Sequence, residues 1–196
     1  MHPIERESYR IMRAMIDMSA LPKHGRDVAE RIVHTTADPA WVDDLVLDEA
    51  ALSRGAKALS EGATLITDVR MVAAGITARA AVCFVDSGGV YVPSGKTRAA
   101  AGIVHAATLY PCGAVWAIGN APTALIELLM LAAKGEVEPA MVVGLPVGFV
   151  GAAESKQALR ESGLPQLSNV SARGGAAVAA AAVNALLYGD PLEEQK

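Results

Sequence analysis

The sequence predicts an α/β fold in which residues 1–196 form a single domain built on a mostly parallel β-sheet. Helices are expected on both faces of the sheet, with two more at the N-terminus. Short β-rich runs alternate with helical stretches, which is the βαβ order of parallel sheets. These runs are mostly continuously apolar, as in strands covered on both faces. The chain is 52% hydrophobic but only 4% aromatic and has 18 glycines, which suits close packing through small side chains.

Apolar residues at helical spacing predict the two N-terminal helices. After Pro3, the residues expected on one face of the first helix are Ile4, Ser8, Ile11, Met12, Met15 and Ile16. Val28, Ile32 and Val33 repeat this spacing before Thr35 and predict the second helix.

Strands and helices are then expected to alternate along the rest of the chain. The expected strands span residues 45–47, 63–69, 81–86, 114–118 and 140–145, with a weaker candidate at 166–170. The expected helices span residues 49–60, 97–109, 122–134, 154–161 and 175–187.

Charge and cysteine content argue against several classes of protein. A net charge of −4 disfavours a broad surface for nucleic acid or anionic membrane. The two cysteines, Cys83 and Cys112, have neither CxxC nor Cys/His ligand spacing, so neither a disulfide framework nor a metal site is expected. The N-terminus is charged where a signal peptide is apolar, and the apolar runs are too short to span a bilayer. A cytoplasmic protein is therefore expected.

The segment GGVYVPSGKTR, residues 88–98, ends in the Gly-Lys-Thr of nucleotide-binding loops. In a P-loop the first glycine stands five positions before the glycine of Gly-Lys-Thr, because the backbone N–H groups must wrap around one phosphate. Val90 occupies that position, and Gly89 comes one residue too early. The spacing therefore argues against a P-loop.

Ligands of open α/β sheets bind outside the carboxyl ends of the strands, and several basic residues are expected there. These residues are Arg70, Lys96, Arg98 and Arg173. Each is either solvated or part of a converging set that holds an anion, for which arginine forks suit carboxylates or phosphates. A polycarboxylate fits better than a nucleotide, because no GxGxxG opens the first βα turn.

His34 is the histidine that stands out. It is expected at the end of the second helix, where the helix C-terminus favours its protonated form. Two interpretations stay open: a functional histidine, or one that only caps its helix.

Six stretches resemble successive signatures of the precorrin-8X methylmutase family. They are RIVHTTAD (31–38), DVRMVAAGIT (68–77), KTR (96–98), AIGNAPTAL (117–125), GLPVGFVGAAESK (144–156) and RGG (173–175). The resemblance runs from about residue 3 to residue 187, with the motifs in the same order. Ala176 departs from a serine that is frequent after Arg-Gly-Gly in the family, which puts one hydroxyl contact in doubt.

The resemblance implies an α/β homodimer that uses no cofactor and no metal. Its implied reaction in cobalamin biosynthesis moves a methyl group between adjacent ring C carbons of precorrin-8X, a 1,5-sigmatropic shift that gives hydrogenobyrinic acid. By motif, His34 matches the catalytic histidine, while Arg98, Ser8 and Thr77 match residues near the substrate. With the residues expected at the strand ends, the expected substrate-binding set is Ser8, Arg70, Thr77, Lys96, Thr97, Arg98, Asn120 and Arg173.

Two alternatives stay open from the sequence. A tetrapyrrole carrier would bind the macrocycle without reacting with it, and replacing His34 would then change nothing but affinity. A nucleotide-binding α/β enzyme would instead respond to ATP or NAD with a change in melting temperature.

Overall fold

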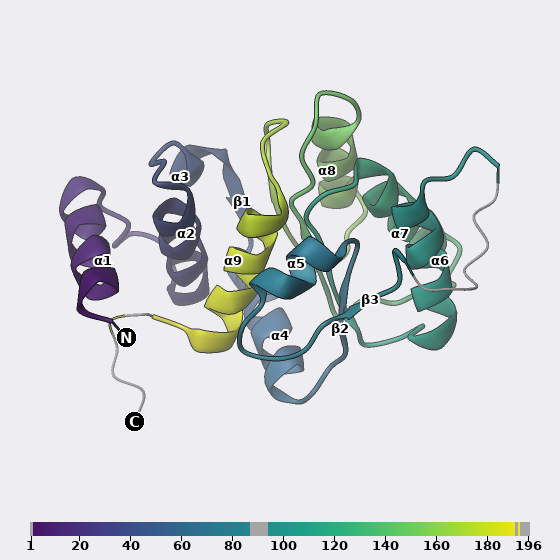
Figure 1. Ribbon diagram of the computed structural model, residues 1–196, viewed down its shortest axis with the longest axis horizontal. Coiled ribbons are helices and arrows are strands. Elements are labelled where there is room, and N and C mark those ends of the chain that lie inside the picture. The colour runs from purple at the N-terminus through teal and green to yellow at the C-terminus, as the bar shows by residue number, and fades with distance from the viewer. Residues whose placement is uncertain (1, 87–93, 191, 193–196) are drawn as a thin grey trace.

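A six-stranded sheet forms the centre of the computed structural model, which describes residues 2–86, 94–190 and 192 (Figure 1). The strands are β1 (Leu45–Leu47), β2 (Leu65–Thr67), β3 (Val82–Cys83), β4 (Val115–Ile118), β5 (Met141–Gly144) and β6 (Gln166–Asn169). They lie in the order β1-β6-β5-β4-β2-β3. Neighbours are parallel except β1 and β6, which are antiparallel. The expected mostly parallel sheet is confirmed.

Helices cover both faces of the sheet (Figure 1). They are α1 (Pro3–Met15), α2 (Lys23–Thr36), α3 (Trp41–Asp44), α4 (Glu49–Ser60), α5 (Arg70–Gly75), α6 (Arg98–Leu109), α7 (Pro122–Ala133), α8 (Ala152–Glu161) and α9 (Ala176–Tyr188). On β4, Val115 and Ala117 join a core with α2, α4, α5 and α9, whereas Trp116 and Ile118 join a second core with α6, α7 and α8. This alternation explains why the strand sequences are continuously apolar.

Several boundaries differ from the sequence prediction. The expected strand at 81–86 is shortened to Val82–Cys83, and residues 85 and 86 form a turn. Helices α3 and α5 were not expected, because four and six residues are too few for a helical period to stand out. Residues 88–93 of the GGVYVPSGKTR segment lie outside the described residues; Thr97 caps α6 by accepting from the N–H of Ala100 at 3.2 Å.

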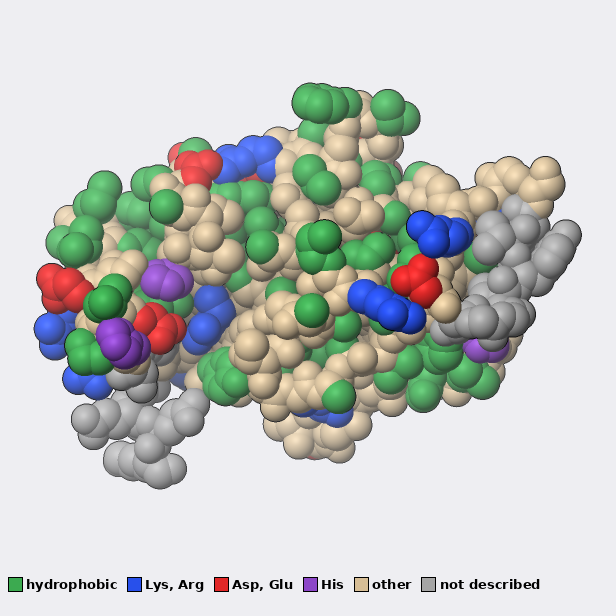
Figure 2. Space-filling model, viewed as in Figure 1, with side chains coloured by type: hydrophobic (Ala, Val, Ile, Leu, Met, Phe, Trp, Pro, Cys, Tyr) green, Lys and Arg blue, Asp and Glu red, His purple; other side chains and the backbone are tan. Residues whose placement is uncertain are grey.

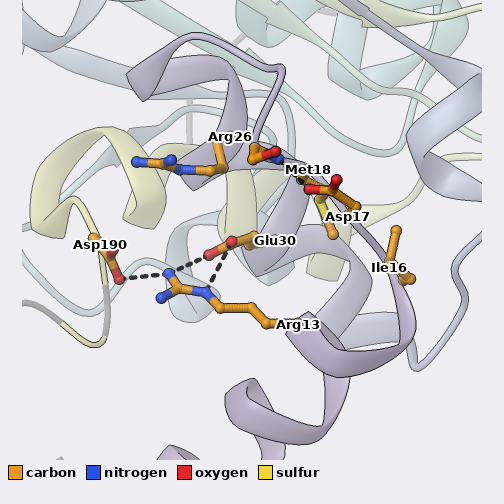
Figure 3. A pocket seen from close by; sticks show the side chains of 8 residues that line it. Arg13, Ile16, Asp17, Met18, Arg26, Glu30 and Asp190 are labelled. Carbon is orange, nitrogen blue, oxygen red and sulfur yellow. Dashed lines mark hydrogen bonds and ion pairs between the residues drawn. The ribbon is translucent and has the colours of Figure 1, made fainter.

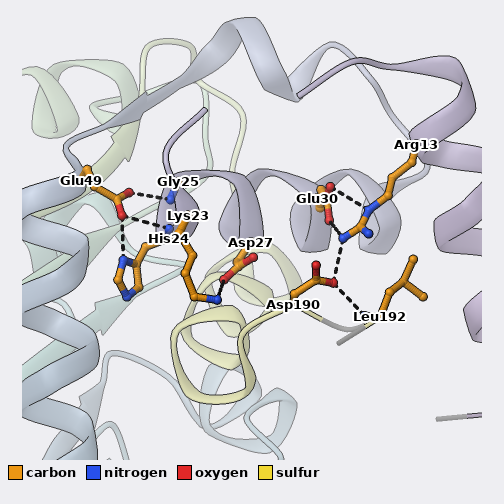
Figure 4. A network of polar contacts seen from close by, with 9 residues as sticks. All are labelled: Arg13, Lys23, His24, Gly25, Asp27, Glu30, Glu49, Asp190 and Leu192. Carbon is orange, nitrogen blue, oxygen red and sulfur yellow. Dashed lines mark hydrogen bonds and ion pairs between the residues drawn. The ribbon is translucent and has the colours of Figure 1, made fainter. Parts of the chain in front are cut away.

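The two N-terminal helices are confirmed, and they run antiparallel to each other. Tyr9 and Met12 are the buried residues of α1, which packs mainly against α2. The start of α2 is held by Glu49, whose carboxylate accepts from the backbone N–H groups of His24 and Gly25 at 3.1 and 2.9 Å (Figure 4). In the described part of the chain, no helix has the length and apolar character needed to cross a bilayer.

Asp68, directly after β2, ties two strand ends together. Its buried carboxylate accepts from the backbone N–H groups of Gly119, Asn120 and Ala121 at 3.0, 2.9 and 2.7 Å. Burial raises the pKa of the Asp68 carboxyl, and the three N–H donors offset part of this rise. The β4–α7 loop is therefore fixed against the neighbouring strand at the edge where ligands of such sheets bind.

Candidate active site

His34 lies in the last turn of α2, and two consecutive residues of α1 hold its ring. Oγ of Ser8 lies 3.1 Å from Nδ1 of His34. The ring of Tyr9 stacks on the imidazole, with centroids 4.3 Å apart and ring planes inclined by 12°. Among the described residues, Nε2 of His34 has no hydrogen-bond partner. The structure thus brings Ser8 and His34 together and leaves Nε2 as the nitrogen that a ligand can meet.

The environment of His34 lowers its pKa. Burial lowers the pKa of the imidazole below its ordinary value of 6.5, the nearby carboxylate of Glu5 opposes this, and the Arg31 guanidinium adds to it. In the free protein, this lowered pKa favours the neutral imidazole. A polyanionic ligand would raise this pKa, because an adjacent negative charge favours the imidazolium.

A mainly apolar cavity of about 180 Å³ lies between α1 and the end of α2. Its lining includes Ser8, Ile11, Met12, Met15, Val33 and His34. Pockets that enclose a drug-sized ligand have about 300–1,000 Å³, so this cavity holds only an edge of a larger molecule. Exposed apolar residues of α1 continue the apolar surface: Ile4 is 75% and Met15 71% exposed. Figure 2 shows hydrophobic side chains interspersed with acidic, basic and histidine side chains at the end of the molecule that α1 forms.

Arg173, in the loop between β6 and α9, reaches the segment that follows His34. Its guanidinium pairs with the carboxylate of Asp38 and lies 4.4 Å from the ring centroid of Trp41. The strand-end loop is therefore joined to the segment that follows α2.

Arg70 and Arg98 form a second group around Asp86. Arg70 Nε lies 3.4 Å from Asp86 Oδ2, and Arg98 Nη1 lies 3.2 Å from Asp86 Oδ1. All three side chains are at least 40% exposed, so the direct energy of these pairs is small. Two cations share one anion, which leaves a local surplus of positive charge.

The remaining expected residues lie at two other places. Lys96 Nζ is 2.5 Å from Oε2 of Glu127 in α7, and Oγ1 of Thr97 is 2.8 Å from Oγ1 of Thr123. Asn120 is exposed in the loop that Asp68 holds. Thr77 lies apart from them, with Oγ1 3.3 Å from the hydroxyl of Tyr188.

A family model, described as CbiC, precorrin-8X methylmutase, matches residues 3–189. The chain belongs to the precorrin-8X methylmutase family. The cobalt-precorrin-8 methylmutase of Methanocaldococcus jannaschii is 41% identical over 82% of this chain and 77% of its own. The precorrin-8X methylmutase of Pseudomonas aeruginosa is 39% identical over 93% of each chain. The crystal structure of a precorrin-8X methylmutase from Thermus thermophilus has a TM-score of 0.85 and 32% identity, covering 93% of each chain.

Sequence reasoning missed Lys156, which is 0% exposed. Its Nζ donates to Oδ1 of Asn169 and to the carbonyls of Ser171 and Arg173, at 2.7, 2.5 and 2.6 Å. Lys156 thereby fixes the loop that carries Arg173. A signal existed in the sequence, because Lys156 shares a helix face with apolar Ala152 and Leu159, which stand four residues before it and three after it.

Lys156 gives the stability of the protein a testable pH dependence. Burial lowers the pKa of its ammonium from 10.5 to about 8. From about pH 8 to pH 10.5 the unfolded chain therefore holds a proton that the folded protein has lost, so this residue makes the free energy of unfolding rise with pH. The slope should be about 1 kcal/mol per pH unit above that of Lys156→Met, measured by urea denaturation. Equal slopes for Lys156→Met and the parent would contradict the lowered pKa of Lys156.

Sequence reasoning also missed Tyr9, although it stands next to Ser8 in a chain with little aromatic content. Among the described residues, no group of three or more His, Cys, Asp or Glu side chains offers a metal site.

Proposed function

We propose that the protein moves a methyl group between adjacent ring C carbons of precorrin-8X and so forms hydrogenobyrinic acid. The relatives of this chain are named as methylmutases of precorrin-8X or cobalt-precorrin-8, which supports a methyl transfer within such a macrocycle. The observation that carries the proposal is the Ser8–His34 pair beside an apolar cavity. Such a place suits one edge of a flat, conjugated ring system next to a group that can supply a proton.

The proposed reaction needs the macrocycle held in one geometry and one proton supplied to it. In a 1,5-sigmatropic shift the bond from the methyl group to one ring carbon breaks as the bond to the next forms, so the protein supplies no nucleophile. Protonated His34 would give its Nε2 proton to a ring nitrogen as general acid, and the proton would return to Nε2 after the methyl group has moved, because substrate and product are isomers. Ser8 Oγ would accept from Nδ1–H in both states, which leaves Nε2 as the nitrogen that titrates.

The basic residues are proposed to hold the carboxylate side chains of the macrocycle. Arg70 and Arg98 support this best, because their two positive charges share the single negative charge of Asp86. Lys96 and Arg173 are each paired with a carboxylate of the protein and would have to exchange it for one of the ligand. Thr77, Thr97 and Asn120 are proposed as neutral contacts.

Both a metal-free and a cobalt-containing substrate fit the family. The relatives from Methanocaldococcus jannaschii and Pseudomonas aeruginosa are named for cobalt-precorrin-8 and for precorrin-8X respectively. Any cobalt would arrive within the macrocycle as part of the substrate. We propose proton transfer from His34 for the metal-free form, whose ring nitrogen has a free lone pair; in a cobalt-containing form the metal would occupy the ring nitrogens.

A homodimer in the cytoplasm is part of the proposal. The cavity beside His34 is too small for a whole macrocycle. Ile4, Ile11 and Met15 of α1 are 75, 54 and 71% exposed beside it, and a second copy would cover them and enlarge the site. The thiols of Cys83 and Cys112 are free, which suits a reducing compartment.

Retention of product tests the proposed function. The purified protein is mixed with hydrogenobyrinic acid and desalted, and corrin absorbance should stay with the protein. Arg98→Ala should bind the product about tenfold to a hundredfold more weakly, because a charge-assisted hydrogen bond contributes about 1.5–3 kcal/mol. It should leave the rate of the bound reaction nearly unchanged, since the contact is the same in substrate and transition state. Equal product affinity of variant and parent would remove Arg98 from the site.

A carrier is distinguished from an enzyme in the same preparation. Precorrin-8X added in single turnover should change its spectrum to that of the product. Retention of hydrogenobyrinic acid without any conversion of precorrin-8X would favour the carrier.

A further inference from the structure

Helix α1, whose Ser8 and Tyr9 contact the His34 ring, buries few apolar side chains of its own. Tyr9 and Met12 are the only residues of α1 that are buried. Cavities lie against α1 in two places: the one beside His34, and a second of about 220 Å³ where the helix ends. The second cavity is lined by charged side chains that include Arg13, Arg26 and Glu30 (Figure 3). Apolar packing alone therefore leaves the position of α1 along α2 weakly defined.

Arg13, near the end of α1, joins three segments by charge (Figures 3 and 4). Its Nε donates to Oε1 of Glu30 at 2.9 Å, and its Nη2 donates to Oε2 of Glu30 at 2.6 Å. Nη2 also lies 2.7 Å from Oδ1 of Asp190, which follows α9. The side chains of Glu30 and Asp190 are only 3 and 9% exposed, so both carboxylates need a nearby cation, and Arg13 pairs directly with both of them.

The two polar contacts between α1 and α2 are coupled by helix geometry. Ser8 and Arg13 are five residues apart on α1, and Glu30 and His34 are four residues apart on α2. At 1.5 Å per residue, these separations are about 7.5 and about 6 Å. Because the helices are antiparallel, the contacts form two rungs about one turn apart. A shift of α1 that opens one rung also moves the other. A bidentate fork fixes direction as well as distance, so the Arg13 rung is the stiffer one.

We propose that Arg13 is a positioning residue, whose fork to Glu30 and link to Asp190 set the register of α1 on α2 and thereby keep Ser8 Oγ at Nδ1 of His34. The turnover part of this inference rests on the proposed function, whereas the register of Ser8 against His34 does not.

The test is a double-mutant cycle with two readouts. Arg13→Met, Ser8→Ala and the double variant are compared with the parent in single-turnover conversion of precorrin-8X and in the NMR titration of the His34 ring. Arg13→Lys is included because it keeps the charge but loses the fork. Arg10→Met is the matched control on the same helix, because Arg10 is exposed and its ion pair with Glu7 is loose, at 3.8 Å. Thermal unfolding confirms that each variant is folded at the assay temperature.

Arg13→Met is expected to slow the methyl shift about tenfold in the parent background and less than about threefold in the Ser8→Ala background, since coupled residues are not additive. It should move the His34 titration midpoint by at least roughly half of the shift that Ser8→Ala causes. Arg13→Lys should recover part of the rate, and Arg10→Met should match the parent.

Three results would overturn the inference. They are a parent-like rate and titration in Arg13→Met, an equal loss in both backgrounds, and an equal effect of Arg10→Met. If the parent itself converts no precorrin-8X, the proposed function fails; the titrations then still decide whether Arg13 positions Ser8.

Discussion

His34→Ala is expected to slow conversion of precorrin-8X by about a hundredfold to ten-thousandfold, the usual cost of losing a general acid. Product affinity should stay within about threefold, because apolar and carboxylate contacts elsewhere hold the macrocycle. The alanine leaves Ser8 Oγ and one face of Tyr9 without the imidazole, and both side chains can remain in place. Single-turnover absorbance measures the rate, and equilibrium titration with hydrogenobyrinic acid measures affinity.

Two further variants sharpen this test. His34→Asn and His34→Gln should not restore the rate, since a neutral amide forms hydrogen bonds but delivers no proton. Tyr9→Phe is the matched control, because it keeps the ring on the imidazole and removes a hydroxyl that has no partner among the described residues. A His34→Gln enzyme with the rate of the parent would mean that the imidazole only orients the macrocycle.

Asp68→Asn should lower the free energy of unfolding by about 3 kcal/mol or more. The substitution changes one oxygen into an NH₂ group, which then faces backbone N–H donors of the β4–α7 loop. At least one donor is left buried without an acceptor, and a charge-assisted bond is lost. Urea denaturation gives the change, and Asp86→Asn is the control because Asp86 is exposed and its partners among the described residues are arginine side chains.

The same variant tests whether the loop belongs to the site. Asn120 follows Gly119 in this loop, so product affinity should fall together with stability. A fully stable Asp68→Asn protein would show that the three N–H groups find other partners.

The sheet and its cover of helices were readable from the sequence because both leave periodic signals. Continuous apolar runs such as 114–118 indicated strands with two buried faces, and β4 has them. The antiparallel pairing of β1 with β6 was not readable, because Leu45–Leu47 has only three residues and its partner lies more than a hundred positions away. Strand order has the same long-range origin.

The site was readable in part. His34 stood out by its place at a helix end, and the resemblance pointed to Ser8 on the first helix. What escaped was how the charges pair: Arg173 with Asp38, Lys96 with Glu127, and Arg13 with Glu30. Such pairs join residues between 17 and 135 positions apart. A single sequence shows which charges exist, and only the fold decides which of them are neutralised.

The dependence of the single-turnover rate on pH tests the central claim that protonated His34 drives the reaction. At limiting substrate, the rate should fall as pH rises, with a midpoint below 6.5, because burial lowers the pKa of the free enzyme's imidazole. At saturating substrate the midpoint should move upward, because carboxylates of the macrocycle favour the imidazolium. His34→Ala should show neither midpoint. A parent rate that is level or rises from about pH 5 to about pH 9, around the ordinary histidine pKa, would contradict the account.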